Sequence, residues 1–92
     1  MEHTVMHNEA ESRFEVALDN KVAVVDYRKM NGVYLAVTHT GVPKEYEGQG
    51  IAAKLTKALL DYARANGLKV KPLCSYARVY MDRHPEYEDL RV

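Results

Sequence analysis

Residues 47–67 read EGQGIAAKLTKALLDYARANG, and this stretch decides the fold. Two glycines, Gly48 and Gly50, form a loop that leads directly into a segment of helical period, predicted from Gln49 to Asn66. Apolar and charged side chains separate onto different faces of that helix. The apolar face consists of Ile51, Leu55, Leu59, Tyr62 and Ala63. Asn66-Gly67 predicts the helix end, because glycine suits the left-handed position after the last turn.

Three runs of strand character precede this loop. They cover residues 13–18, 21–30 and 33–40, in which apolar side chains alternate with others or valine is frequent. Asp19-Asn20 and Asn31-Gly32 separate the runs, and both pairs are two-residue turn signals typical of hairpins. We therefore expect an antiparallel meander of three strands.

A fourth strand and a second helix are expected after the long helix. Residues 69–73 form the predicted strand, and Pro72 favours a place at a sheet edge or a bulge. Ser75 is the predicted N-cap of a helix that runs to about Arg83 and that Pro85 ends. Because the long helix is a crossover connection, the third and fourth strands should be parallel.

The predicted fold class is therefore α/β, of the α+β kind. One mixed sheet of about four strands, in the order β-β-β-α-β-α, carries two helices packed on it. The single domain is expected to span residues 13–92, after a loose N-terminal lead-in at residues 1–12. Leu90, near the end of the chain, is expected to pack down onto this domain.

Length and charge exclude several classes of protein. The chain has 92 residues, in keeping with one domain, and its 13 basic and 13 acidic side chains cancel. Partnership with nucleic acid or a membrane surface is not expected, since both need excess positive charge. No apolar run approaches the roughly 18 residues of a membrane span. The first dozen residues lack the apolar core of a signal peptide, so we expect a cytoplasmic protein, either a monomer or a weak dimer.

Metal and disulfide chemistry are not expected. His3 and His7 lie four residues apart, which would suit a metal on a helix, but nothing nearby in the sequence completes a ligand set. Cys74 is the single cysteine, so an intrachain disulfide cannot form and the interest of this residue lies in its thiol.

The glycine loop before the long helix is a candidate anion site. Glycines allow a backbone to approach a ligand closely, and the first amides of a helix have no partners within it. Together with the helix dipole, these amides suit phosphate oxygens. The alternative is a tight turn without a ligand. The Walker and dinucleotide fingerprints do not match, because no Gly-Lys-Ser/Thr ending is present and Ala53 stands where a third glycine would be.

Several motifs in order resemble the short single-domain branch of the GNAT N-acetyltransferase superfamily. The similarity extends from about Arg13 to Leu90. The motifs are Arg13-Phe14-Glu15, Asp26-Tyr27, His39-Thr40-Gly41-Val42-Pro43, Gly48-Gln49-Gly50-Ile51-Ala52, Pro72-Leu73-Cys74-Ser75-Tyr76 and His84-Pro85-Glu86-Tyr87. The resemblance implies a minimal GNAT fold that binds acetyl-CoA, with an open acceptor side, since this branch lacks the first strand and helices of a full domain.

The resemblance also implies which residues contact the cofactor. Backbone groups of Thr40 and Val42 would line the pantetheine arm. The pyrophosphate would be held by Gly48, Gln49, Gly50, Ile51 and Ala52. One departure is acidic: Glu45 stands where the superfamily usually has Gln or Arg, and Glu47 where a basic residue is common. A carboxylate near a pyrophosphate is unfavourable, and Lys44 and Lys54 are candidates to compensate for it.

Three residues are candidate catalytic groups. By resemblance, Tyr80 on the second helix would protonate the departing thiolate; alternatively Tyr76 and Tyr80 only pack one helix face. Cys74 precedes a helix start, which favours a thiolate, so it is either an acyl acceptor or a residue that lines the pocket. His39 ends the third strand, and histidine is the side chain whose ordinary pKa suits a general base near neutrality; alternatively His39 bonds a loop backbone.

Two classes of function follow. The first is an N-acetyltransferase that transfers an acetyl group from acetyl-CoA to a primary amine, on a small molecule or on a protein lysine or N-terminus. The second is a non-catalytic module that binds acetyl-CoA or CoA, or a domain that only contacts a partner. Tight binding of CoA without turnover would favour the second class.

Overall fold

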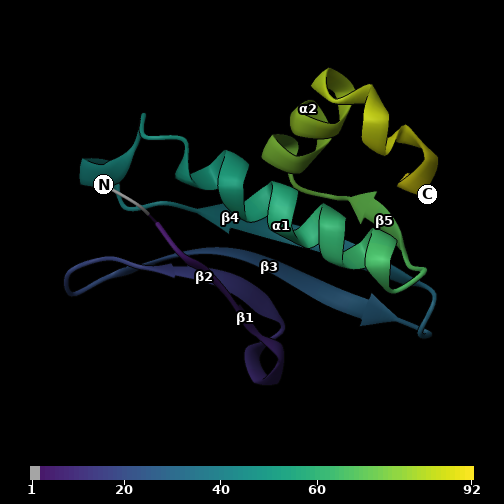
Figure 1. The fold of residues 1–92 in the computed structure, drawn as a ribbon, viewed down its shortest axis with the longest axis horizontal. Coiled ribbons are helices and arrows are strands. Elements are labelled where there is room, and N and C mark those ends of the chain that lie inside the picture. The colour runs from purple at the N-terminus through teal and green to yellow at the C-terminus, as the bar shows by residue number, and fades with distance from the viewer. Residues whose placement is uncertain (1–2) are drawn as a thin grey trace.

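In the computed structural model, which describes residues 3–92, five strands form one mixed sheet in the order β1-β2-β3-β4-β5. Two α-helices lie on one side of the sheet (Figure 1). The elements are β1 Val5–Asn8, β2 Arg13–Ala17, β3 Val22–Met30, β4 Tyr34–Gly41, α1 Ile51–Ala65, β5 Lys69–Pro72 and α2 Ser75–Arg83. The predicted α+β class with a mixed sheet is confirmed.

Both predicted hairpin turns are present. Leu18 N donates to Lys21 O at 2.9 Å, which closes the turn between β2 and β3. Between β3 and β4, Asn31 and Gly32 have φ of 54° and 66°. Positive φ at two successive turn residues matches the twist of the flanking strands, which is why Asn-Gly is favoured there. These turns fix the register of the β2-β3-β4 meander.

A fifth strand is the main difference from the sequence-based expectation. Residues 1–12 were expected to form a loose lead-in, but β1 pairs with β2 in antiparallel register from Val5↔Val16 to Asn8↔Arg13. A 3-10 helix, Glu9–Glu11, joins the two strands. Met1 and Glu2 of that lead-in lie outside the described residues. The physical reason for the added strand is local packing: Val5 packs against the core, and the His7 ring stacks on Phe14 with 4.0 Å between centroids.

The crossover unit follows the prediction. β4 and β5 are parallel, in register from Tyr34↔Lys69 to Val37↔Pro72, with α1 between them in the chain. Gly67, with φ of 67°, follows the end of α1. Pro72 is the last residue of β5, at the edge of the five-stranded sheet, where a residue without an N–H is tolerated.

The second helix begins with a different cap from the one expected. Cys74, rather than Ser75, is the N-cap of α2, and its Sγ accepts a hydrogen bond from Ala77 N at 3.5 Å. Ser75 is the first helical residue. Pro85 ends α2 as predicted and starts a 3-10 helix, Pro85–Leu90, in which Leu90 is buried. The last residue continues the sheet edge, because Val92 N donates to Val70 O at 2.9 Å.

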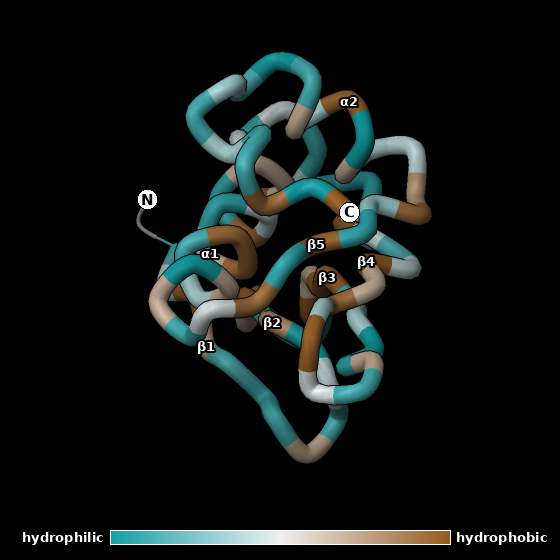
Figure 2. Tube along the Cα trace, turned by 90° about the vertical axis from the view of Figure 1, so that its right-hand side faces the viewer, coloured by the Kyte–Doolittle hydropathy of each residue, from teal (hydrophilic) through white to brown (hydrophobic). Residues whose placement is uncertain are grey.

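The core lies between α1 and α2 and one face of the sheet. Fully buried side chains come from every layer: Val16, Val25, Leu35, Val37, Leu55, Leu59, Leu60, Val70 and Met81. In Figure 2 the tube of α1 alternates between brown and teal, in keeping with one apolar and one polar face. The other face of the sheet carries no α-helix in the described part of the chain. No helix among residues 3–92 has the length and apolar character to cross a membrane.

Candidate functional site

A pocket of about 350 Å³ lies at the N-terminal end of α1. It is bounded by the end of β4, the glycine loop, the first turn of α1 and the start of α2. Its lining residues are Thr40, Val42, Tyr46, Glu47, Gly48, Gly50, Ile51, Ala52, Ala53 and Tyr76. The structure thus brings together all but one of the residues that the sequence assigned to a cofactor. The exception is Gln49, whose side chain contacts His3 instead.

The two loop glycines have backbone conformations that other residues rarely adopt. Gly48 has a φ of 85° and Gly50, the N-cap of α1, has a φ of 78°. A Cβ added at either position would meet no atom within 4 Å. The left-handed backbone is therefore the reason for glycine at both positions, and the space around them is open.

The backbone amides of residues 48–53 form a row of free donors. Within the described chain none of them donates to a backbone or side-chain acceptor; the first paired amide is that of Lys54, which donates to Gly50 O at 3.1 Å. No side chain caps the helix, and no acidic residue occupies its first turn. The positive end of the helix dipole therefore faces the pocket without a capping side chain or a carboxylate in the first turn of the helix, which suits phosphate oxygens.

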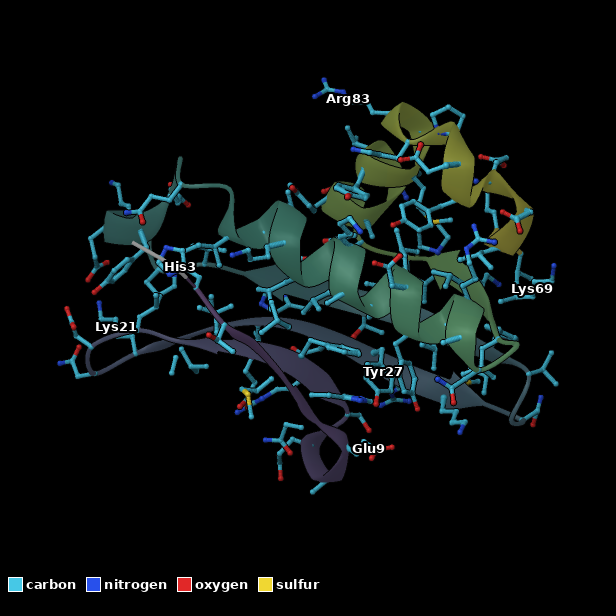
Figure 3. The ribbon with its side chains drawn as sticks, viewed as in Figure 1. His3, Glu9, Lys21, Tyr27, Lys69 and Arg83 are labelled. Atoms are coloured by element: carbon cyan, nitrogen blue, oxygen red, sulfur yellow. The ribbon has the colours of Figure 1, made fainter. Side chains whose placement is uncertain are left out.

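The two glutamates that depart from the superfamily pattern have different surroundings. Glu45 pairs with Lys21 at 2.7 Å, and this hydrogen bond lowers the pKa of the Glu45 carboxyl. Glu45 does not line the pocket, whereas Glu47 does. The Lys54 ammonium donates to His3 O at 2.9 Å. Figure 3 shows His3 and Lys21 at the end of the molecule where α1 begins.

Strands β4 and β5 separate next to the pocket. Val37 O accepts hydrogen bonds from both Leu73 N, at 3.0 Å, and Cys74 N, at 3.1 Å, which turns the chain away from β4. β4 continues to Gly41, paired only with β3 on its other side. One edge of residues 38–41 is therefore left without a strand, and backbone groups along it are free to bind an extended ligand.

Cys74 lies at the point where the two strands separate. Its half-buried thiol is 3.5 Å from the hydroxyl oxygen of Thr40, which lines the pocket. The structure thus brings Cys74 and Thr40 together, as the sequence-based site requires. The thiol also caps α2, so this residue has a structural role that sequence reasoning had assigned to Ser75.

The tyrosine on α2 that reaches the pocket is Tyr76, which was expected only as a packing partner of Tyr80. Tyr76 lines the pocket, while Tyr80, one turn further on, is buried and stacks on the His84 ring with 3.8 Å between centroids. Burial raises the pKa of both phenols, so each stays protonated at neutral pH. The role of Tyr80 as a proton donor stays a prediction.

His39 lies on the other face of the sheet. Thr40 lines the pocket, and side chains of neighbouring residues in a strand point to opposite faces. The His39 ring lies over Gly41, where an added Cβ would be 2.9 Å from Nε2. His39 is exposed and does not line the pocket. The structure therefore separates this candidate base from Cys74 and Tyr80.

The pocket has three lining residues that sequence reasoning missed, Tyr46, Ala53 and Tyr76, whereas Glu47 was expected near the phosphates. Ala53 carried a signal, because its amide is among the first in the helix and has the same free donor as Ala52. Tyr76 carried a weaker one, as it lies in the first turn of α2, directly after Cys74 and Ser75. Its place in the pocket depends on how α2 packs beside α1, which no local pattern encodes.

A minimal α+β fold with a free strand edge beside a helix start of unpaired amides is that of a GNAT-like domain, and comparisons with known proteins give the family. The model of the GCN5-related N-acetyl-transferase family matches residues 13–90. Protein NATD1 of Mus musculus is 34% identical over 83 residues, covering 88% of this chain and 76% of that protein. Protein NATD1 of Homo sapiens is also 34% identical, with 74% of its length covered.

A solved structure agrees with these relatives. The NMR solution structure of a GCN5-like protein from Staphylococcus aureus superimposes with a TM-score of 0.78 at 32% identity. The match covers 97% of this chain and 87% of the bacterial one. The chain therefore belongs to the GCN5-related N-acetyltransferase family, and the resemblance found in its sequence motifs is confirmed.

Proposed function

We propose that this protein binds acetyl-CoA at the start of α1 and transfers the acetyl group to a primary amine. The observation that carries the proposal is the row of free amides at residues 48–53, beside a strand edge that has no partner. The free amides suit phosphates, and the strand edge leads from them to Thr40 and Cys74. Membership of the family supports the same assignment.

The position of each residue in the pocket decides which part of acetyl-CoA it is proposed to bind. The amides of residues 48–53 bind the pyrophosphate, and the free edge of β4, at Thr40 and Val42, binds the pantetheine arm. Bound acetyl-CoA supplies a thioester, whose carbonyl carbon accepts a nucleophile. The gap between β4 and β5, flanked by Thr40 and Cys74, is where that thioester is accessible from the other face of the sheet.

Proton transfer in the proposed reaction involves groups on both faces. Tyr76 lines the pocket and stays protonated because burial raises its pKa, so it is suited to donate a proton to the leaving thiolate, as Tyr80 was expected to do. His39 lies on the face from which an amine approaches, where it is suited to accept a proton. Cys74 lines the gap, and direct transfer to the amine needs no acyl-cysteine.

A second candidate function is a module that binds acetyl-CoA or CoA without turnover. Glu47 favours it, because its carboxylate lines the pocket that would hold the pyrophosphate and weakens the positive field there. Such a module would bind CoA and acetyl-CoA about equally and would consume neither.

Calorimetric titration with acetyl-CoA and with CoA tests the cofactor, and thioester loss across a panel of amines tests the reaction. We expect dissociation constants in the micromolar range and thioester loss that depends on the amine. Binding without any thioester loss at high protein concentration would favour the non-catalytic module. Absence of binding heat would refute both functions and reduce the glycine loop to a turn.

A further inference from the structure

A second hollow, of about 460 Å³, lies on the sheet face that α1 and α2 leave open. Its lining residues are Arg28, Met30, Tyr34, Ala36, Thr38, Lys71 and Leu73. They come from three neighbouring strands and from the residue after β5. The volume is within the range typical of sites for small molecules.

The strand register explains the shape and the charge of this hollow. Arg28 is opposite Ala36 on β4, and Ala36 is opposite Lys71 on β5. The small Ala36 side chain forms the floor between two cationic walls, whose Cα atoms are about 10 Å apart across two interstrand spacings. No acidic side chain lines the hollow, and within residues 3–92 neither cation forms an ion pair.

One end of the hollow reaches the gap between β4 and β5. Thr38 and Leu73 line that end, and Leu73 is followed directly by Cys74, which contacts Thr40 in the pocket. Thr38 is the extra residue of a β-bulge, since Asp26 pairs with His39 and Tyr27 with Val37. The hollow and the pocket are thus on opposite faces of the sheet and meet at this gap.

We propose that this hollow binds the acceptor, and that the acceptor is a small primary amine carrying a carboxylate. The carboxylate lies over Ala36 between Arg28 and Lys71, and the amine lies at Thr38 and Leu73. Two residues along β4 separate these positions, about 6.6 Å. An ω-amino acid of about four to six carbons spans that distance, whereas glycine does not. The inference rests on the proposed acetyl transfer.

Acetyl transfer in this site begins with the protonated acceptor amine. The acceptor first loses one proton to water, because the two cations and the absence of a lining carboxylate disfavour its ammonium form. The lone pair of the neutral amine forms a C–N bond to the acetyl carbon, and the C–S bond breaks. The nitrogen gives up its second proton to His39, the thiolate takes up one from Tyr76, and exchange with water restores both side chains, which leaves the N-acetyl amino acid and CoA.

Matched amines test the charge requirement. Rates with 4-aminobutyrate, butylamine and 1,4-diaminobutane are measured at saturating acetyl-CoA, with glycine and 6-aminohexanoate to probe the spacing. We expect kcat/KM for 4-aminobutyrate to exceed that for butylamine by about tenfold or more, since a hydrogen bond to a charged group is worth about 1.5–3 kcal/mol. Diaminobutane and glycine should be poor acceptors.

Variants of the hollow separate this inference from the proposed function. Arg28→Gln and Lys71→Gln should each remove most of the carboxylate preference, through KM, and should leave the affinity for CoA unchanged. Ala36→Leu should block the hollow by volume alone. Lys29→Gln is the matched control, because Lys29 is on β3 beside Arg28 but outside the hollow. It should leave every constant unchanged.

An NMR titration tests binding of the acceptor even if the protein shows no turnover. The ¹⁵N-labelled protein saturated with CoA is titrated with 4-aminobutyrate and with butylamine. Only the former should shift the amides of Ala36, Thr38 and Leu73, and Arg28→Gln should abolish the shifts. Equal responses to both amines, or acetylation of acidic peptides with no preference among small amines, would overturn the inference. If the unmodified protein does not bind CoA, the proposed function is refuted instead.

Discussion

At the scale of single residues, the two ends of α1 offer a matched pair of glycines. Gly50 at the start and Gly67 after the end have φ of 78° and 67°, and an added Cβ meets no atom within 4 Å at either position. Alanine at either position therefore has the same backbone cost, about 1 kcal/mol. The two positions differ only in what lies beside them, since Gly50 lines the pocket.

We predict that Gly50→Ala weakens CoA binding by about tenfold or more, because its Cβ occupies space that the phosphates need, about 1.4 kcal/mol. Gly67→Ala should lower the unfolding free energy by a similar amount to Gly50→Ala and leave CoA affinity unchanged. Calorimetry and thermal unfolding measure both effects. Equal CoA affinity in the two variants would show that the loop does not hold phosphates.

Cys74 also has two separable roles, as a helix cap and as a neighbour of the pocket. Its Sγ accepts from Ala77 N, and serine is a better acceptor at such a position. We predict that Cys74→Ser keeps the CoA affinity within twofold, raises the unfolding free energy by about 0.5 kcal/mol and retains acetyl transfer within tenfold.

Cys74→Ala is the control for the cap, and it should cost about 1 kcal/mol of stability. Thermal unfolding and initial rates are measured for both variants. If Cys74→Ser binds acetyl-CoA normally but transfers no acetyl group, the reaction passes through an acyl-cysteine rather than by direct transfer.

At the scale of elements, β1 is held by an aromatic cluster of His7, Phe14, Tyr27 and Tyr62. His7 stacks on Phe14, meets the Tyr62 ring edge-on at 4.5 Å, and its Nε2 is 2.7 Å from the Tyr27 hydroxyl. Figure 3 shows Tyr27 beneath α1. Burial lowers the pKa of His7, against a smaller opposing effect of Glu9.

This lowered pKa predicts a pH dependence with a defined sign. Above about pH 6.5, His7 is neutral in both the folded and the unfolded chain. As the pH falls below 6.5, the unfolded chain takes up the proton first, so stability decreases, and the decrease ends below the folded-state pKa. The double variant His7→Phe/Tyr27→Phe should show a smaller loss of Tm between pH 7 and pH 5.

The single variant Tyr27→Phe keeps the imidazole and is the control, so its Tm should retain the pH dependence of the parent protein. An identical pH dependence in the double variant would mean that His7 protonation does not contribute.

Most elements could be predicted from sequence because their signals are local. The Asn31-Gly32 turn, the apolar face of α1 and the glycines before it each specify a structure within a few residues. β1 has no such signal: it is four residues long, and a polar histidine occupies one of its core-facing positions. The β-bulge at Thr38 also has no local sequence signal. Because of this bulge, Thr40 and Val37, three residues apart, lie on the same face of the sheet, with Val37 in the core and Thr40 in the pocket.

The site could be predicted where it depends on backbone and not where it depends on packing between elements. Glycines before a helix indicate free amides that can bind a ligand, so the loop residues could be proposed as a site from sequence. The separation of His39 from Cys74 depends on the bulge, and the approach of Tyr76 depends on the docking of α2. Both are set by contacts distant in sequence.

At the scale of the whole molecule, β1 is part of the folded domain and moves its expected start toward the N-terminus. The expected domain of residues 13–92 and the family match at residues 13–90 both leave out this strand. In the structure β1 covers the edge of β2, and the side chains of Val5 and His7 pack against the domain.

We predict that a variant lacking residues 1–12 loses about 2–4 kcal/mol of unfolding free energy, from two partly buried side chains and an uncovered strand edge. Its CoA affinity should stay within a few fold, because the pocket lining includes no residue before Thr40, and His3 contacts this region only through the Gln49 side chain and the Lys54 ammonium. Chemical denaturation measures the loss. Unchanged stability would restore the view of these residues as a loose lead-in.

The gap between β4 and β5 has a further consequence, for the kinetic order of the proposed reaction. The pocket and the hollow open on opposite faces of one sheet and share only the short boundary formed by Thr38, Thr40, Leu73 and Cys74. Neither substrate then covers the entrance of the other, so the two bind in random order, and neither product has to wait for the other to leave. Initial-rate plots with both substrates varied should intersect, and each product should inhibit competitively against its own substrate.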